Sequence, residues 1–211
     1  MRRHRTLTWF RLGSAALVIA AIVFQLAWLV NEGRFDPFRF FAFFTIQSNI
    51  LGVVVFLALV GRGDRPRTLV VELLRGAAVV YLTVTFVVVI AFLSGEDVQL
   101  ELQWVDFVLH KVFPVVVVLD WLIDPPTVRL PWRAALLWLA YPLLWVTLTL
   151  VRGAADGWYP YPFLDPANGG YASVAAYFVT ILGFFLVLGG AVVALGNLRS
   201  DPARERSQPA N

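Results

Sequence analysis

The chain lacks cysteine altogether and contains one methionine, one lysine and two histidines among its 211 residues. Without cysteine there is no disulfide, no thiolate nucleophile and no cysteine-ligated metal site. Charged residues are also few, at 15%, whereas hydrophobic residues make up 59% and the mean hydropathy is +0.74. Because a water-soluble domain does not carry this much apolar sequence, the composition predicts a membrane protein.

Six apolar stretches, each about as long as the ~20 residues that cross a bilayer core, make up most of the sequence. They cover residues 13–31, 38–60, 69–93, 104–123, 132–151 and 171–195. Lipid cannot satisfy free backbone N–H and C=O groups, and these stretches do not alternate every second residue, so helices are expected rather than a β-barrel. The sequence therefore predicts an all-α membrane protein, a six-transmembrane-helix bundle in one domain over residues 1–211. Residues 1–12 would form a basic tail and residues 198–211 a flexible one.

Basic residues are unevenly distributed over the connections between these stretches. Thirteen of the seventeen lie on the side of the two termini, so the positive-inside rule predicts that both termini are cytoplasmic. The acidic segment between the third and fourth stretches is expected outside; its carboxylates are Glu96, Asp97, Glu101 and Asp106. Asp120 and Asp124 are expected beside Arg129 and Arg133 at the inner end of the fourth stretch. The net charge of +3 therefore indicates topology rather than a nucleic-acid surface, and sixteen arginines against one lysine favour a bacterial cytoplasmic membrane.

Polar residues interrupt the second apolar stretch. Thr45, Ser48, Asn49 and Gly52 are spaced i, i+3, i+4 and i+7, so they share one helix face, whereas Gln47 points elsewhere. The ordinary interpretation is a helix–helix contact, which small and polar residues often line in membranes. The alternative is a functional site, because polar side chains within a span are costly in lipid.

His110, the only histidine outside the N-terminal tail, lies about six residues into the fourth stretch. Thr45 lies about seven residues into the second, so at 1.5 Å per residue both are ~10 Å below the outer boundary. A threonine hydroxyl becomes a nucleophile when a base removes its proton, and an imidazole is suited to that role. We therefore predict a nucleophile–base pair, with Ser48 or Asn49 as candidate donors to an oxyanion.

Asp106 precedes His110 by four residues and so lies on the same helix face. We interpret it first as a solvated carboxylate favoured by the start of a helix dipole. The alternative is that it holds the imidazole tautomer, as the acid of a catalytic triad does. A metal site is disfavoured, because His110 has no further ligands at suitable spacing and His4 lies in the tail.

Three short segments carry a family resemblance. The first is Phe43-Phe44-Thr45, which opens the second stretch; the second is His110 followed by Pro114 in an apolar helix that ends at Asp120. The third and most specific is Tyr161-Pro162-Phe163-Leu164-Asp165, before the last stretch. These segments resemble the androgen-induced and androgen-dependent membrane protein family, multi-span lipid hydrolases that use threonine and histidine. The His110–Pro114 spacing is one residue shorter than the family pattern leads us to expect, and Ser48 adds a second candidate nucleophile.

The resemblance implies that Thr45 is the nucleophile and His110 its base. The family's substrates are fatty acid esters of hydroxy fatty acids, and no cofactor is implied. Tyr161, Phe163 and Asp165 would line the substrate pocket. The expected protein is thus a multi-pass membrane hydrolase whose partner is a membrane lipid or fatty-acyl ester and not a nucleic acid.

Two other classes remain open at this point. A non-enzymatic lipid-binding or transport protein would use the same polar cluster as a headgroup site. A purely structural bundle would use it only to pack helices. The aromatic loop over residues 158–165 is likewise either an anchor at the membrane boundary or a cover over a site.

Overall fold

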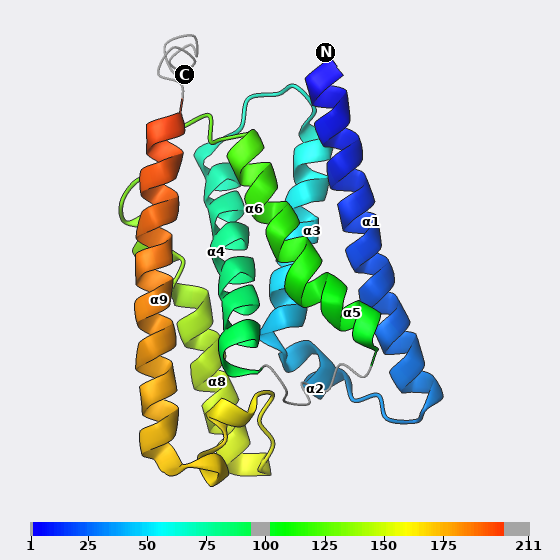
Figure 1. Cartoon of the computed structure of the whole chain (residues 1–211), viewed down its shortest axis with the longest axis vertical. Coiled ribbons are helices and arrows are strands. Elements are labelled where there is room, and N and C mark those ends of the chain that lie inside the picture. The colour runs from blue at the N-terminus through cyan, green and yellow to red at the C-terminus, as the bar shows by residue number, and fades with distance from the viewer. Residues whose placement is uncertain (1, 94–101, 201–211) are drawn as a thin grey trace.

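The computed structural model describes residues 2–93 and 102–200, and every regular element in these ranges is helical (Figure 1). The long helices are α1 (Arg2–Asn31), α3 (Phe44–Arg62), α4 (Leu69–Phe92), α8 (Ala140–Asp156) and α9 (Gly170–Arg199). The shorter elements are α2 (Pro37–Ala42), α5 (Gln103–Phe107), the π-turn η1 (Val108–Val112), α6 (Phe113–Ile123), α7 (Ala134–Leu137) and the 3₁₀ turns η2 (Pro162–Leu164) and η3 (Pro166–Asn168). The predicted all-α class is confirmed. Glu96, Asp97 and Glu101 of the predicted acidic loop and residues 201–211 of the predicted tail lie outside the described residues.

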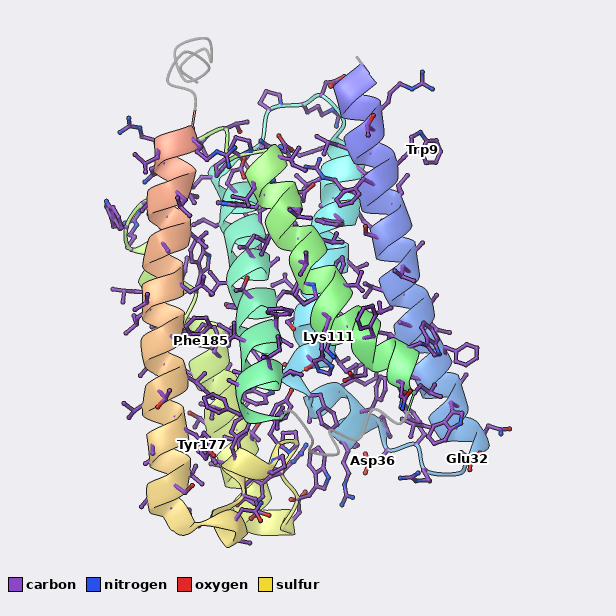
Figure 2. All side chains as sticks on the ribbon, viewed as in Figure 1. Trp9, Glu32, Asp36, Lys111, Tyr177 and Phe185 are labelled. Atoms are coloured by element: carbon purple, nitrogen blue, oxygen red, sulfur yellow. The ribbon has the colours of Figure 1, made fainter. Side chains whose placement is uncertain are left out.

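Five helical segments in the described ranges are long and apolar enough to span a membrane. They are Arg5–Asn31, Phe44–Arg62, Leu69–Phe92, Ala134–Asp156 and Gly170–Arg199. The remaining predicted span, residues 104–123, is divided into α5, η1 and α6, so no single α-helix there reaches that length. Large apolar side chains cover the outside of the bundle; Trp9 of α1, for example, is 69% exposed and projects away from the other helices (Figure 2). Such a surface is typical of a protein embedded in lipid.

Two boundaries differ from the prediction. Residues 2–12, predicted as a tail, continue α1, because neither proline nor glycine interrupts the chain before Gly13. The second stretch is two helices rather than one, since Phe43 is extended (φ −66°, ψ 125°) between α2 and α3. Thr45 is therefore the second residue of α3, and the count of seven residues along one continuous helix was wrong.

The fifth stretch is also interrupted, between α7 and α8. Pro142 lacks the N–H that would bond to the carbonyl of Trp138 four residues earlier. That carbonyl instead accepts a hydrogen bond from the hydroxyl of Tyr81 at 2.8 Å. The carbonyl left free by the interruption is therefore satisfied, and this hydrogen bond ties the segment between α7 and α8 to α4.

Helix α4 occupies the centre of the bundle, where α3, α6 and α9 pack against it, while α1 packs against α3. Gly76 of α4 allows the close approach of Trp138, because a Cβ at Gly76 would lie 2.2 Å from the indole ring. The start of α1 and the end of α9 lie at one end of the bundle, here the terminal end (Figure 1). Helix α2, the start of α3 and the loop over residues 157–169 lie at the other, here the α2 end.

A buried ionic cluster joins the helices at the terminal end. It consists of Arg11, Arg67, Arg75, Glu72, Asp120 and Asp124. Arg11 donates to Asp120 at 2.7 Å, and Arg75 donates to Glu72 at 2.9 Å and to Asp120 at 3.2 Å. The prediction that Asp120 and Asp124 lie beside Arg129 and Arg133 was wrong, because the packing of α1 and α4 against α6 brings other arginines to them. These arginines therefore hold helices together as well as contributing to the charge asymmetry.

Candidate active site

Thr45 lies at the start of α3, where the chain passes from the extended Phe43 into the helix. Its side chain is buried, and its Oγ1 lies 2.9 Å from Nε2 of His110. His110 is on η1 and is 2% exposed. The predicted contact between the hydroxyl and the imidazole is present.

The position of His110 follows from Pro114, four residues further along. Because proline has no N–H, regular α-helical bonding stops here and the chain forms the π-turn η1. In this turn the N–H of Phe113 bonds to the carbonyl of Val108, five residues earlier. The carbonyl of Leu109 is thereby released from the helical hydrogen bonds. π-Turns of this kind are frequent at functional sites, where they redirect a side chain.

Asn49 forms a hydrogen bond with the released carbonyl of Leu109. Its side-chain amide donates to the carbonyl of Leu109 at 3.1 Å and to the carbonyl of Thr45 at 2.8 Å. Asn49 is fully buried, so both hydrogen bonds are formed away from water. The amide thus ties the turn that carries His110 to the helix that carries Thr45.

Asp106 contacts the other side of the imidazole. Its Oδ1 lies 2.7 Å from Nδ1 of His110, and its side chain is 25% exposed. The first interpretation, a solvated carboxylate at a helix start, is therefore incomplete, because the spacing of four residues brings the carboxylate onto the imidazole. The geometry matches the alternative, in which the carboxylate sets the tautomer.

With a neutral imidazole, the three groups have complementary hydrogen-bonding roles. Asp106 accepts from Nδ1–H, which leaves the lone pair of Nε2 to accept from the hydroxyl of Thr45. The imidazole is then neutral and able to receive the threonine proton. This is the arrangement that a nucleophile, a base and an orienting acid require.

The loop over residues 157–169 adds a fourth polar group, the hydroxyl of Tyr161. It lies 3.2 Å from Oγ1 of Thr45 and accepts the backbone N–H of Thr45 at 3.3 Å. Burial raises the pKa of Tyr161, so the phenol is neutral near pH 7. Sequence reasoning placed Tyr161 in the pocket but missed its contact with Thr45, because no spacing relates positions 116 residues apart.

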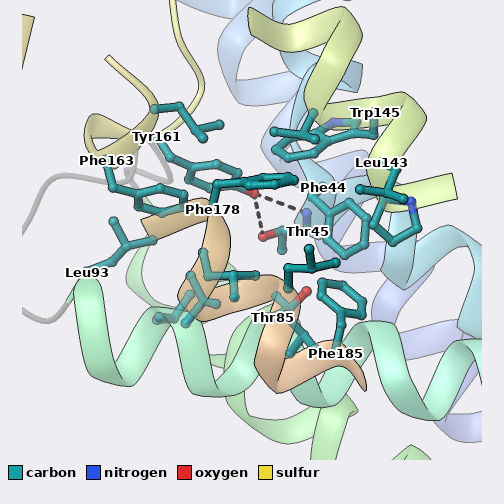
Figure 3. Close-up of a pocket in the computed structure, with 18 of the residues that line it drawn as sticks. Phe44, Thr45, Thr85, Leu93, Leu143, Trp145, Tyr161, Phe163, Phe178 and Phe185 are labelled. Carbon is teal, nitrogen blue, oxygen red and sulfur yellow. Dashed lines mark hydrogen bonds between the residues drawn. The ribbon is translucent and has the colours of Figure 1, made fainter. Parts of the chain in front are cut away.

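An apolar cavity of about 90 Å³ opens beside Thr45 and Tyr161 (Figure 3). Its wall comes mainly from α4, α8, α9 and the loop, and includes Val88, Leu143, Val146, Phe163, Phe178, Ile181 and Phe185. The hydroxyl groups in this wall belong to Thr45, Thr85 and Tyr161, and no lining residue carries a charge. The aromatic loop therefore covers a cavity, in agreement with one of its two predicted roles.

Several predicted site residues do not reach this cavity. Ser48 lies behind Thr45, where its hydroxyl donates to the Thr45 carbonyl at 3.1 Å and lies 3.3 Å from Oγ1 of Thr85. Neither Ser48 nor Asn49 lines the cavity, so neither faces the space that an oxyanion would occupy. Asp165 is also outside it, because its carboxylate accepts the N–H of Ala167 and caps η3.

The fold and the site together define a class: an all-helical protein with membrane-spanning character and a threonine–histidine–aspartate chain beside an apolar cavity. No group of three or more His, Cys, Asp or Glu side chains in the described ranges is arranged to hold a metal ion. Comparison with protein-family models, curated proteins and solved structures finds no match for the chain. The resemblance to the androgen-induced and androgen-dependent family therefore stays a prediction.

Proposed function

We propose that the protein is an integral membrane hydrolase that cleaves lipid acyl esters with Thr45 as nucleophile and His110 as base. The observation that carries this proposal is the 2.9 Å contact between Oγ1 of Thr45 and Nε2 of His110, with Asp106 on the opposite ring nitrogen. A nucleophilic mechanism requires a hydroxyl, an imidazole and a carboxylate in this order, whereas a bundle that only packs helices does not.

The reaction would proceed in two steps. Oγ1 of Thr45 attacks the ester carbonyl carbon while Nε2 of His110 takes its proton, and the resulting imidazolium is stabilised by Asp106. The tetrahedral intermediate breaks its bond to the alcohol oxygen, which receives the proton from His110, leaving an acyl-threonine. Water then gives a proton to His110 and attacks the acyl carbon, and Thr45 leaves with that proton. The products are a fatty acid and an alcohol.

The cavity favours an acyl chain as the group held beside Thr45. Its wall is apolar and uncharged, and it lies between α4, α8 and α9, whose outer surfaces carry large exposed apolar side chains such as Val179 and Leu148. Burying an acyl chain contributes about 0.8 kcal/mol per CH₂ group. Fatty acid esters of hydroxy fatty acids, the substrates that the family resemblance implies, are the first candidates.

We further propose six membrane crossings, with α5, η1 and α6 together forming the fourth. Residues 103–123 would cover about 30 Å at 1.5 Å per residue, which matches the hydrocarbon thickness of a bilayer. Both chain ends then lie on the cytoplasmic side of a bacterial membrane, as the arginine distribution predicts. The candidate site would face the outer leaflet.

The proposal is tested with purified protein in detergent and an ester of a hydroxy fatty acid. Thr45→Ala and His110→Ala should each lower kcat by at least about 10³-fold, because the members of a catalytic unit are individually essential. Ser48→Ala tests the second candidate nucleophile and should keep turnover within about threefold, and Thr180→Ala, on the exposed face of α9, is the matched control. Full turnover in either of the first two variants would remove that residue from the mechanism.

A lipid carrier is the alternative that the apolar cavity also fits. A fluorophosphonate probe distinguishes the two, because it reacts only with an activated hydroxyl. The hydrolase should be labelled at Thr45, and labelling should disappear in His110→Ala. Reversible binding of fatty acid without labelling would favour the carrier.

A further inference from the structure

Resting on the proposed hydrolase function, we propose that Tyr161 is a further catalytic residue of this reaction. Its hydroxyl would donate a hydrogen bond to the ester oxygen that becomes negatively charged in the transition state. Ser48 and Asn49, the donors expected from the sequence, have their hydrogens committed to backbone carbonyls. Tyr161 is the donor that both lines the cavity and contacts the attacking atom.

The hydrogen bonds of the site leave the phenolic proton directed at the reacting atoms. The backbone N–H of Thr45 donates to the oxygen of Tyr161 at 3.3 Å, so the phenol is the acceptor in that contact. The hydroxyl of Thr45 donates to Nε2 of His110 in the tautomer set by Asp106. With that neutral imidazole, Oγ1 of Thr45 is free to accept, and the proton of Tyr161 points to it across 3.2 Å.

This proton becomes available when the reaction begins. As Oγ1 of Thr45 shares an electron pair with the carbonyl carbon, it becomes a weaker hydrogen-bond acceptor. The carbonyl oxygen on the same carbon gains negative charge, and rotation about the phenol C–O bond brings the O–H of Tyr161 to it. No proton is transferred in this contact, so the phenol stays neutral throughout and the electron balance of the reaction is unchanged.

A second donor lies beside the phenol. The N–H groups in the first turn of a helix have no partner within the helix, and Thr45 is the second residue of α3, which has no side-chain cap. Its N–H, now bonded to Tyr161, would point at the same oxygen. Two donors converging on one position are the arrangement that stabilises tetrahedral intermediates in acyl transfer.

The ring of Tyr161 is held in place by three aromatic neighbours. It stacks on Phe163 with ring centres 5.3 Å apart and planes within 2°, and it contacts Phe43 at 5.8 Å and Trp145 at 6.0 Å. A donor fixed in this way needs little reorganisation during the reaction, which is the condition under which such a contact lowers a barrier most.

The test is Tyr161→Phe in the purified full-length protein, which removes the hydroxyl and keeps the ring. We expect kcat to fall about 100-fold, the loss typical of removing one oxyanion donor, with KM changed less than about threefold. Tyr159→Phe is the matched control, because it removes a hydroxyl from the same loop outside the cavity, and it should keep wild-type turnover. Thermal unfolding of both variants shows whether the loop is still folded.

A thionoester substrate separates a catalytic role from a structural one. Sulfur accepts hydrogen bonds poorly, so the wild-type enzyme should prefer the oxygen ester over its thiono analogue. Tyr161→Phe should reduce this preference about tenfold or more, whereas a damaged loop would slow both substrates equally. An unchanged preference, or turnover equal to that of Tyr159→Phe, overturns the role of Tyr161 and leaves the hydrolase standing. Absence of turnover in the wild type would overturn both.

Discussion

Each polar side chain of the site has a partner that limits what it can do. The hydroxyl of Thr45 is hydrogen-bonded to the imidazole of His110, which is hydrogen-bonded in turn to the carboxylate of Asp106. The amide of Asn49 donates to two backbone carbonyls. Because buried polar groups are costly to leave unpaired, such a chain fixes proton positions as well as atom positions. It follows that a change at Asp106, which does not touch Thr45, should still affect Thr45 through His110.

Asp106→Asn is the sharpest test at the scale of one residue. The amide can donate to Nδ1 of His110, which moves the ring proton to Nε2 and leaves no lone pair for the hydroxyl of Thr45. We expect kcat to fall about 10³–10⁴-fold with little change in KM. Steady-state kinetics on a soluble ester measure this effect.

Asp165→Asn is the matched control for this variant. It changes another carboxylate at the α2 end, one that caps η3 and does not line the cavity. Its kcat should stay within about threefold of wild type. A similar small loss in Asp106→Asn would mean that Asp106 does not set the tautomer.

At the scale of an element, the π-turn η1 is the feature that aims His110. In a regular α-helix each residue advances by about 100°, so one extra residue in a turn rotates every side chain that follows relative to those before it. Pro114 prevents the regular form, and the amide of Asn49 stabilises the π-form by donating a hydrogen bond to the released Leu109 carbonyl. The break in the helix can thus be buried, because the carbonyl that it releases accepts a hydrogen bond from Asn49.

Pro114→Ala should let the helix return to regular bonding. The helix would gain an N–H donor and His110 would turn away from Thr45, so we expect kcat to fall at least about tenfold while the thermal midpoint is unchanged or raised. Kinetics and thermal unfolding in detergent measure the two effects. Val115→Ala, at an outward-facing position that is 45% exposed, is the control and should alter neither. Full activity in Pro114→Ala would show that the turn does not depend on the proline.

At the scale of the whole molecule, the terminal end and the α2 end use buried polar groups differently. The ionic cluster at the terminal end pairs every carboxylate with an arginine, and Glu72 and Arg75 are almost fully buried. Removing one partner of such a cluster leaves an uncompensated charge, which costs about 3–5 kcal/mol. At the α2 end the buried groups are mostly neutral, and Thr45 and Tyr161 among them line a cavity, which is what a site requires and a structural joint does not.

Acid should weaken the cluster through Asp124. Burial works to raise the pKa of Asp124, but Arg67, Arg11 and Arg75 outweigh it and hold the pKa at about 2, against an ordinary value of 3.8. A folded-state pKa below the unfolded value stabilises the protein above about pH 4, and this contribution is lost as the pH falls towards 2. The pKa difference corresponds to about 2 kcal/mol.

The thermal midpoint in detergent, measured from pH 6 to pH 2.5, should therefore fall steeply below pH 4. Asp124→Asn should have a lower midpoint at pH 6 and a shallower fall in acid, because its side chain does not titrate. Asp36→Asn is the control, since that carboxylate is about half exposed and lies outside the cluster. Equal pH profiles for wild type and Asp124→Asn would contradict this role for Asp124.

Much of the architecture could be read from the chain. Apolar runs of bilayer length predicted helices, and the stripe at Thr45, Ser48, Asn49 and Gly52 predicted a buried face, because both are periodic properties of a single helix. All four residues are buried. Helix ends were less predictable: the separate α2 and the helical residues 2–12 depend on local backbone conformation and on the absence of a breaker, which hydropathy does not report.

The sequence by itself determined that this chain builds apolar helices and that Thr45 and His110 are exceptional within them, since the cost of polar groups in lipid is a property of residue type. Only the tertiary structure decided which polar groups meet. Tyr161 reaches Thr45 across 116 positions, and Arg11 reaches Asp120 across 109, because helix packing and a folded loop bring them together. Contacts of this kind have no period in the sequence, so they are settled by packing, which depends on all the helices at once.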